Sequence, residues 1–189
     1  MVRRQDALSL DESIVLDAGT GAQIGFIVTE AGQVFMETFA SAQPQSRLWV
    51  MAADETTATL AIDHFRPSEL AEQHAGVLIT ADWIIGGREK GLVRLSIEQP
   101  DAWETLLESD GFVLLQSAAD GYVYYVITEA PSESERHYRV ERVALSGGGD
   151  PEVLRRTDFP PQSVVTRDGT MYWAEDGKLL RKELGAVPR

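Results

Sequence analysis

The sequence contains no cysteine among its 189 residues, so it can form neither a disulfide nor a thiolate metal site. It has only three histidines, His64, His74 and His137, and no two of them stand at the short spacing of a histidine pair on one helix face. We expect structural roles for these histidines, with metal binding or acid–base chemistry as the alternative. The sequence therefore predicts no cofactor and no bound metal.

Positive charge is scarce. The chain has 17 Lys and Arg residues against 30 Asp and Glu residues, which gives a formal net charge of -13. Like charge repels the phosphates of nucleic acids and the headgroups of anionic membranes, so we expect no nucleic-acid partner. The acidic balance suits a basic partner or serves solubility alone.

Long apolar runs are missing too. No segment approaches the roughly 18 apolar residues that a membrane helix needs, so we expect no membrane insertion. The basic start Met1–Arg4 is followed by acidic residues and not by an apolar segment, so we identify no signal peptide. A cytoplasmic protein and an excised extracytoplasmic domain both fit this pattern, and the compartment stays open.

A convincing long helical pattern is also absent. Only Pro67–Gln73 has helical propensity, and it fits a weak strand equally well. Instead, a small residue or Asp followed by glycine precedes a strand-like run at four places. These glycines, Gly32, Gly76, Gly121 and Gly169, lie about 45 residues apart, a period typical of β-propeller blades.

The sequence thus predicts an all-β fold, a β-propeller of about four blades with four antiparallel strands each, forming a single domain over residues 1–189. The last repeat lacks a strand, and the run Ser13–Asp17 stands ahead of the first one. We expect this N-terminal strand to pair beside Lys178–Leu184 and close the ring, because an unpaired sheet edge invites aggregation. The predicted repeats are 22–66, 67–110, 111–160 and 161–189 with 13–17.

Two segments share a further motif, Gly121–Tyr125 (GYVYY) and Gly169–Trp173 (GTMYW), and each is followed by a strand that contains arginine. The first continues as Ala144–Gly148 (ALSGG) and then Pro151–Leu154 (PEVL). This order resembles the propeller repeats of the bacterial TolB and YWTD groups, most clearly over about residues 110–184. Those groups have about six blades, so the resemblance also implies that this chain is part of a larger ring. It implies no active-site residue, since such propellers serve as binding scaffolds and as enzyme appendages.

No catalytic motif stands above background. Gly147–Gly149 is followed by neither Lys-Ser/Thr nor a helix, so it predicts a connecting turn and not a phosphate loop, and no G-x-S-x-G element occurs. The Asp-Gly pairs predict hairpin turns in preference to calcium sites: Asp110-Gly111, Asp120-Gly121, Asp168-Gly169 and Asp176-Gly177.

Large aromatic side chains lie mostly inside the expected strands. We expect them to pack between blades, and a stacking platform for a sugar or a peptide is the alternative. They are Trp49, Trp83, Trp103, Trp173, Tyr124, Tyr125 and Tyr172.

The sequence best supports a non-catalytic binding or interaction module, with a protein or small-molecule ligand at the loop face or channel mouth. The loops Ser41–Ser46, Gly86–Gly91 and Glu129–Arg136 join second to third strands, so they should cluster at one end. The alternatives are a hydrolase- or lyase-type enzyme or enzyme appendage with a polar site at the mouth, and a fragment of a larger bacterial sensor or envelope propeller. A monomer and a homodimer both fit. The candidate partner residues are Gln43, Gln45, Arg88, Glu89, Lys90, Glu133, Glu135 and Arg136.

Overall fold

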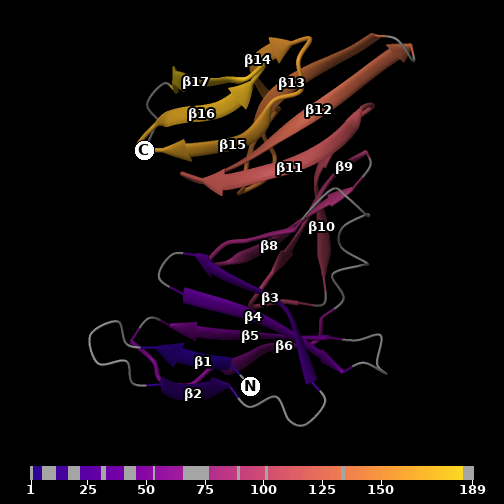
Figure 1. Cartoon of the computed structure of the whole chain (residues 1–189). Coiled ribbons are helices and arrows are strands. Elements are labelled where there is room, and N and C mark those ends of the chain that lie inside the picture. Colours follow the sequence, from indigo (N-terminus) through magenta and orange to yellow (C-terminus); the bar gives the residue numbers. More distant parts are fainter. Residues whose placement is uncertain are drawn as a thin grey trace. The chain divides into compact units, whose positions relative to one another are not determined.

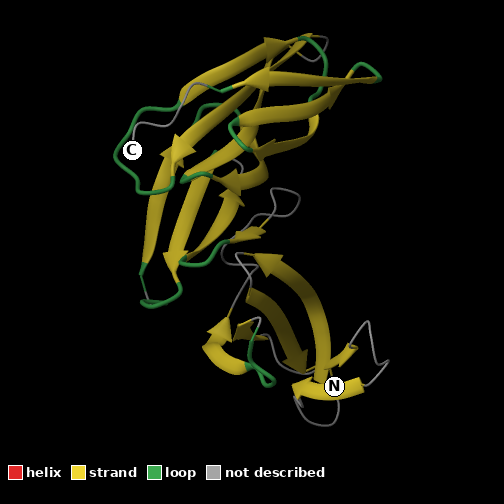
Figure 2. Cartoon of the chain, turned by 90° about the vertical axis from the view of Figure 1, so that its left-hand side faces the viewer, coloured by secondary structure: helices red, strands yellow, loops and turns green. Residues whose placement is uncertain are grey.

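The computed structural model describes residues 2–5, 12–16, 22–30, 33–40, 46–52, 54–65, 77–88, 90–100, 102–132 and 135–184. All regular structure in these residues is β-strand, which confirms the predicted all-β class (Figure 1 and Figure 2). The strands form antiparallel sheets, each built from strands consecutive in the sequence. The segment Pro67–Gln73 lies outside the described residues.

The chain divides into two compact units. The first comprises residues 1–66 and 79–83, and the second comprises residues 67–78 and 84–189. Each unit is described by itself below. The single domain over residues 1–189 stays a prediction.

The first unit contains a two-stranded sheet, in which β1 (Val2–Gln5) pairs with β2 (Glu12–Leu16), and a four-stranded sheet of order β3-β4-β5-β6. Leu16 is buried against Met36 and Met51, so the β1–β2 hairpin packs on the larger sheet. The strands of the larger sheet are β3 (Ala22–Glu30), β4 (Gln33–Ala40), β5 (Ser46–Ala52) and β6 (Thr59–Phe65).

The second unit contains three sheets, apart from the tip of the β7–β8 hairpin, residues 79–83, which belongs to the first unit. The first of these sheets consists of β7 (Val77–Ile79), β8 (Trp83–Arg88), β9 (Gly91–Ser96) and β10 (Trp103–Glu108). The second consists of β11 (Phe112–Ala119), β12 (Tyr122–Ser132), β13 (Glu135–Ala144) and β14 (Glu152–Thr157). The third has β15 (Gln162–Arg167), β16 (Thr170–Glu175) and β17 (Lys178–Glu183).

Three of the four Asp-Gly pairs make the predicted tight turns. The φ values of Asp and Gly are 53° and 77° at Asp120-Gly121, 50° and 72° at Asp168-Gly169, and 50° and 69° at Asp176-Gly177. Two positive φ angles in a row are the signature of the type I′ hairpin turn, which suits Asp followed by glycine. Asp110-Gly111 is different, because it joins β10 to β11 of the next sheet and neither residue has a positive φ.

The core of the second unit lies between the β11–β14 and β15–β17 sheets. Apolar side chains that alternate along the strands point to one face, as a pleated strand requires. Polar contacts also tie the sheets together: among them, Lys182 Nζ donates to the Leu154 carbonyl at 2.7 Å, and Val164 N donates to Gln116 Oε1 at 3.2 Å. The buried cluster comprises Tyr124, Val126, Val140, Leu154, Val164, Met171 and Trp173.

The aromatic predictions are confirmed in part. Tyr124, Tyr125 and Trp173 are buried, as expected for packing residues, whereas Trp103 is exposed. Trp49, Trp83 and Tyr172 are half-buried.

The N-terminal strand pairs with a segment that was not predicted as its partner. β2 pairs with β1, and the β15–β17 sheet has three strands. The local hairpin closes a short loop, whereas pairing with β17 would require nearly the whole chain to be closed, at a greater cost in chain entropy.

Two predicted loops are also shorter than expected. Gly86 and Gly87 are buried inside β8, where glycine permits a close approach of neighbouring backbone, so the connection to β9 begins after Arg88. The hairpin of β12 and β13 continues to the pair Ser132↔Glu135, because main-chain pairing extends through the charged segment.

The predicted strand Val77–Trp83 is a hairpin. Thr80 N donates to the Trp83 carbonyl at 2.8 Å, and Trp83 N donates to Thr80 Oγ1 at 3.0 Å. The threonine hydroxyl thus holds a tight turn that interrupts the apolar run.

Candidate functional site

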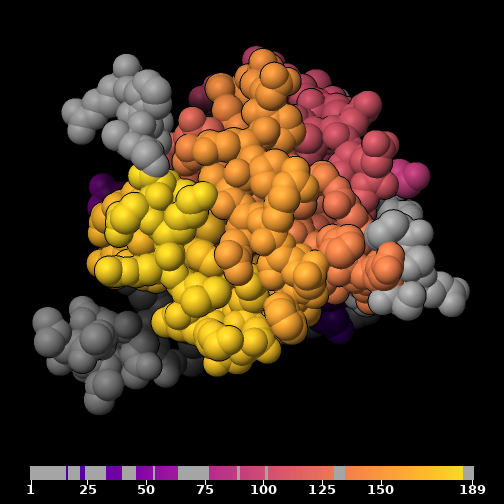
Figure 3. Space-filling model, turned by 90° about the horizontal axis from the view of Figure 1, so that it is seen from above, coloured from indigo at the N-terminus to yellow at the C-terminus, as the bar shows by residue number. Residues whose placement is uncertain are grey.

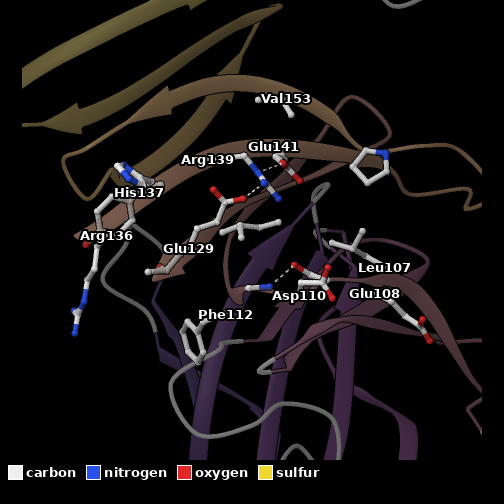
Figure 4. A pocket seen from close by; sticks show the side chains of 16 residues that line it. Leu107, Glu108, Asp110, Phe112, Glu129, Arg136, His137, Arg139, Glu141 and Val153 are labelled. Atoms are coloured by element: carbon white, nitrogen blue, oxygen red, sulfur yellow. Dashed lines mark hydrogen bonds and ion pairs between the residues drawn. The ribbon is translucent and has the colours of Figure 1, made fainter. Parts of the chain in front are cut away.

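A groove of about 1200 Å³ lies at one end of the β11–β14 sheet, within the second unit (Figure 4). One wall is the connection Leu107–Phe112 between β10 and β11, and the other is made by the facing ends of β12 and β13. The lining residues are Leu107 to Phe112, Ile127 to Glu129, Arg136 to Arg139, Glu141, Pro151 and Val153.

Local hydrogen bonds hold the β10–β11 connection in place. Gly111 N donates to Ser109 Oγ at 3.2 Å, and Ser109 N donates to the Lys90 carbonyl at 3.0 Å. A Cβ atom at Gly111 would lie 2.8 Å from the Thr128 carbonyl oxygen, closer than real Cβ atoms come. Glycine at this position therefore lets the connection approach β12, which explains why this Asp-Gly pair is not a hairpin turn.

Arg139 stands at the centre of the groove between two carboxylates, Glu129 and Glu141 (Figure 4). Its Nε donates to Glu141 Oε1 at 2.6 Å, and its other end contacts Glu129. Tyr125 lies directly opposite Glu141 in the β12–β13 register, and its hydroxyl donates to Glu141 Oε2 at 3.1 Å. Both oxygens of the buried Glu141 carboxylate are thus occupied.

The Tyr125 hydroxyl stays protonated over the whole range in which proteins are folded. Burial raises its pKa well above the usual range, and the negative charge of Glu141 raises it further. The phenol is therefore a permanent donor to Glu141. This network fixes the floor of the groove, and each oxygen of Glu141 already accepts one hydrogen bond from the protein.

The rim of the groove carries the side chains that a ligand can meet. Phe112 and Val153 are 38% and 40% exposed, a large share for apolar side chains beside a concave surface. Glu108, Asp110 and Arg136 are exposed and have no ion-pair partner among the described residues. The rim thus offers apolar contact together with charges of both signs.

A smaller hollow of about 300 Å³ continues this surface toward β8 and β9. It shares Leu107 and Glu108 with the groove and adds Arg88 and Lys90.

The structure places half of the predicted partner residues. Arg136 lines the groove, Arg88 and Lys90 line the adjoining hollow, and Glu135 is exposed at the start of β13. These residues lie where second strands meet third strands, and their role in binding a partner stays a prediction. Gln43, Gln45, Glu89 and Glu133 lie outside the described residues.

Sequence reasoning missed the groove's centre and its apolar rim. Glu129 becomes a neighbour of Arg139 only through the β12–β13 register, in which Ile127 faces Arg139. The signal that was available is the alternation in Arg139–Glu141, two oppositely charged residues separated by one apolar residue on a strand.

The histidines of the described residues assemble no metal site. His137 Nδ1 lies 2.7 Å from Asp158 Oδ1, and both side chains are exposed. No group of three or more His, Asp or Glu side chains in the described part of the chain could hold a metal ion. His74 and the side chain of His64 lie outside the described residues.

The sequence matches no known protein family and no curated protein. Among solved structures, it is similar to a prolyl endopeptidase from a structural and mechanistic analysis of two such enzymes, with a TM-score of 0.60 and 14% identity. The likeness covers 94% of this chain but only 30% of that one, so the chain spans about a third of the enzyme's length. A thermostable family-43 glycoside hydrolase matches at a TM-score of 0.37 and 13% identity over 86% of this chain and 66% of that chain, too low for any inference.

The first likeness concerns the fold alone. Prolyl endopeptidases contain a propeller domain, so it fits the predicted propeller class. The described residues contain no helix long and apolar enough to span a membrane.

Proposed function

We propose that the chain is a β-propeller-type binding module that holds an extended segment of a protein partner in the groove beside the β12–β13 hairpin. The observation that carries this proposal is the lining of the groove, which includes the exposed side chains Phe112 and Val153. It also includes Asp110 and Arg136, which have no ion-pair partner among the described residues. Apolar anchors flanked by a few charged groups are what a groove for a peptide segment needs.

The chemistry of the groove supports binding over catalysis. Arg139 pairs with both Glu129 and Glu141, and Tyr125 donates to the second oxygen of Glu141. Enzyme acids and bases instead need a free oxygen or nitrogen within reach of the substrate. The central network therefore serves to shape the groove.

Selection of peptides from a random display library against the purified chain tests this proposal. We expect the selected peptides to bind the Phe112→Ser and Arg136→Glu variants at least tenfold more weakly than the original chain, because each change removes a rim contact. Arg167→Glu provides a matched control, since this exposed arginine lies on β15, outside the groove. Peptides that bind all three variants as well as the original chain would refute the groove assignment.

A second candidate function is the non-catalytic appendage of a hydrolase. The likeness to a prolyl endopeptidase, of which the chain spans 30%, favours this candidate. The longer reading frame that encodes the chain would test it: a hydrolase domain in the same frame supports an appendage, and further repeats of about 45 residues support a larger propeller instead.

The finer architecture belongs to the same proposal. About four blades with TolB/YWTD-like repeats are supported by the Gly-x-x-Tyr strands at Gly121 and Gly169 and by the succession of sheets built from consecutive strands. An experimental structure that showed a sandwich of two large sheets would contradict it.

A further inference from the structure

In every four-stranded sheet, an arginine on the third strand binds a carboxylate on the fourth. In the three cases the arginine nitrogen and the carboxylate oxygen are 2.9, 2.5 and 2.7 Å apart. The last two pairs stand directly opposite each other in the strand register. The three pairs are Arg47–Asp63, Arg94–Glu104 and Arg142–Glu152.

The three-stranded sheet has the arginine without the carboxylate. Arg181 on β17 faces Tyr172, just as Arg142 on β13 faces Tyr124, and each tyrosine stands at the third place after the glycine of an Asp-Gly turn. Arg181 is exposed and has no partner among the described residues. No other described strand pairs with the outer edge of β17.

An apolar side chain beside this arginine is uncovered as well. Leu179 corresponds to Val140, since each stands two residues before the arginine on its strand. Val140 is fully buried, with an exposed fraction of 0%, whereas Leu179 is 79% exposed. Figure 3 shows the C-terminal strands, in yellow, on the surface of the second unit.

Two of the three fourth strands in the described residues share a short pattern. β10 and β14 each carry Glu-x-Leu, in which the glutamate binds the arginine and the leucine is buried. In β10 and β14 a β-bulge follows the glutamate, and the leucine lies at that bulge. If a regular strand with this pattern ran antiparallel to β17 with its glutamate opposite Arg181, its leucine would stand opposite Leu179. The pattern therefore fits both uncovered side chains at once.

We propose that the free edge of β17 binds an extended acidic segment of a partner protein as a fourth antiparallel strand. The segment carries a glutamate that faces Arg181 and a leucine two residues later that covers Leu179. An edge strand offers unpaired main-chain groups to an incoming strand, and pockets on alternate residues give selectivity. Charge complementarity supports an acidic occupant, because Arg181 is exposed without a partner among the described residues. The lysines of β17 have contacts of their own, Lys178 with Asp176 and Lys182 with the Leu154 carbonyl. This surface is separate from the groove.

A fluorescein-labelled peptide that copies residues 101–109 (DAWETLLES), with the Glu-x-Leu of β10, tests the proposal by fluorescence anisotropy. We expect saturable binding to the full chain and a Kd at least about fivefold weaker for Arg181→Glu, where attraction becomes repulsion. A second peptide, with lysine in place of the first glutamate, should reverse this preference and bind Arg181→Glu more tightly than the original chain. Leu179→Ser should weaken both peptides.

The control is Arg167→Glu, an exposed arginine on β15 of the same sheet, which should leave the Kd of both peptides unchanged. Equal losses for Arg167→Glu and Arg181→Glu would overturn the proposal, because they would show non-specific charge attraction. Absence of binding would also overturn it. So would a dimer of the chain that excludes the peptide and dissociates on Arg181→Glu, since the occupant would then be a second copy.

Discussion

The β11–β14 sheet and the β15–β17 sheet start with the same hairpin, an Asp-Gly turn with two positive φ angles followed by a tyrosine opposite an arginine. Beyond that point they diverge. In the first sheet Arg142 binds Glu152 and stacks on Tyr122, with its guanidinium carbon 4.3 Å from the ring centre. In the second, Arg181 has no such partner among the described residues. Local sequence therefore decides turn and register, while the neighbouring strand and sheet decide burial.

The largest expected effect compares two leucines. Leu154→Ala in β14 should cost about 2–5 kcal/mol of unfolding free energy, because it leaves a cavity in the core between the two sheets. Leu179→Ala in β17 should change it by less than about 0.5 kcal/mol, since that side chain faces solvent. Urea unfolding of both variants measures the difference. Equal losses would show that Leu179 is covered in solution.

The next effect concerns a carboxylate that joins the two sheets. Glu175 accepts hydrogen bonds from Arg155 Nη2 at 2.6 Å and from Trp173 Nε1 at 3.0 Å. Glu175→Gln removes the charge from this buried contact with β14, and we expect a loss of about 1–2 kcal/mol at neutral pH. Urea unfolding at neutral pH measures it.

The same contact gives stability a pH dependence of defined sign. The hydrogen bond from Arg155 holds the pKa of Glu175 below its ordinary value despite burial. A lowered pKa in the folded state stabilises the protein above the ordinary pKa of about 4.3, and this contribution disappears as the pH falls through the folded-state pKa. The difference in unfolding free energy between the original chain and Glu175→Gln should therefore become smaller in acid. A difference that stayed constant as the pH fell would argue against a charged Glu175.

The third effect compares the two arginines. Arg142→Ala should cost about 1–2 kcal/mol, because it loses the contacts with Glu152 and with the Tyr122 ring. Arg181→Ala should leave thermal and urea unfolding almost unchanged in the isolated chain. If both substitutions lower the free energy of unfolding equally, Arg181 has a partner in solution.

The smallest effect should be the same in both sheets. Gly121→Ala and Gly169→Ala each place a side chain at a positive φ, 77° and 72°, and a Cβ atom would touch nothing within 4 Å at either position. The cost is then backbone strain alone, about 1 kcal/mol for each. Thermal unfolding of the two variants would sharpen the comparison, and unequal shifts would mean that the turns differ more than their angles do.

Most of the strand plan could be predicted from the sequence, because it depends on local features. The Asp-Gly turns at Asp120, Asp168 and Asp176 and the bounds of β10, Trp103–Glu108, follow from turn chemistry and apolar runs. The partner of Ser13–Asp17 could not be predicted in this way, because both the distant segment Lys178–Leu184 and the nearby strand β1 could pair with it. Asp110-Gly111 was misread for a related reason, since its role depends on the packing of Gly111 against Thr128.

The candidate site was less accessible to sequence reasoning. The predicted residue Arg136 lines the groove. Phe112 and Val153 belong to no sequence motif, and their exposure depends on where the strands around the groove begin and end. The arginine–carboxylate pairs did leave a trace. Arg94 and Glu104, and also Arg142 and Glu152, are each separated by 10 positions, which is the reach of one hairpin.

Each sheet is built from strands that follow one another in the chain, and tight hairpins join most of them. Little chain entropy is lost when such neighbours pair, so every sheet has a low contact order of its own. We therefore expect folding to start in several sheets independently, with packing of the sheets against each other through clusters such as that of Trp173 and Tyr124 following later. Amide hydrogen exchange would be expected to follow sheet boundaries, with each sheet opening as one cooperative unit.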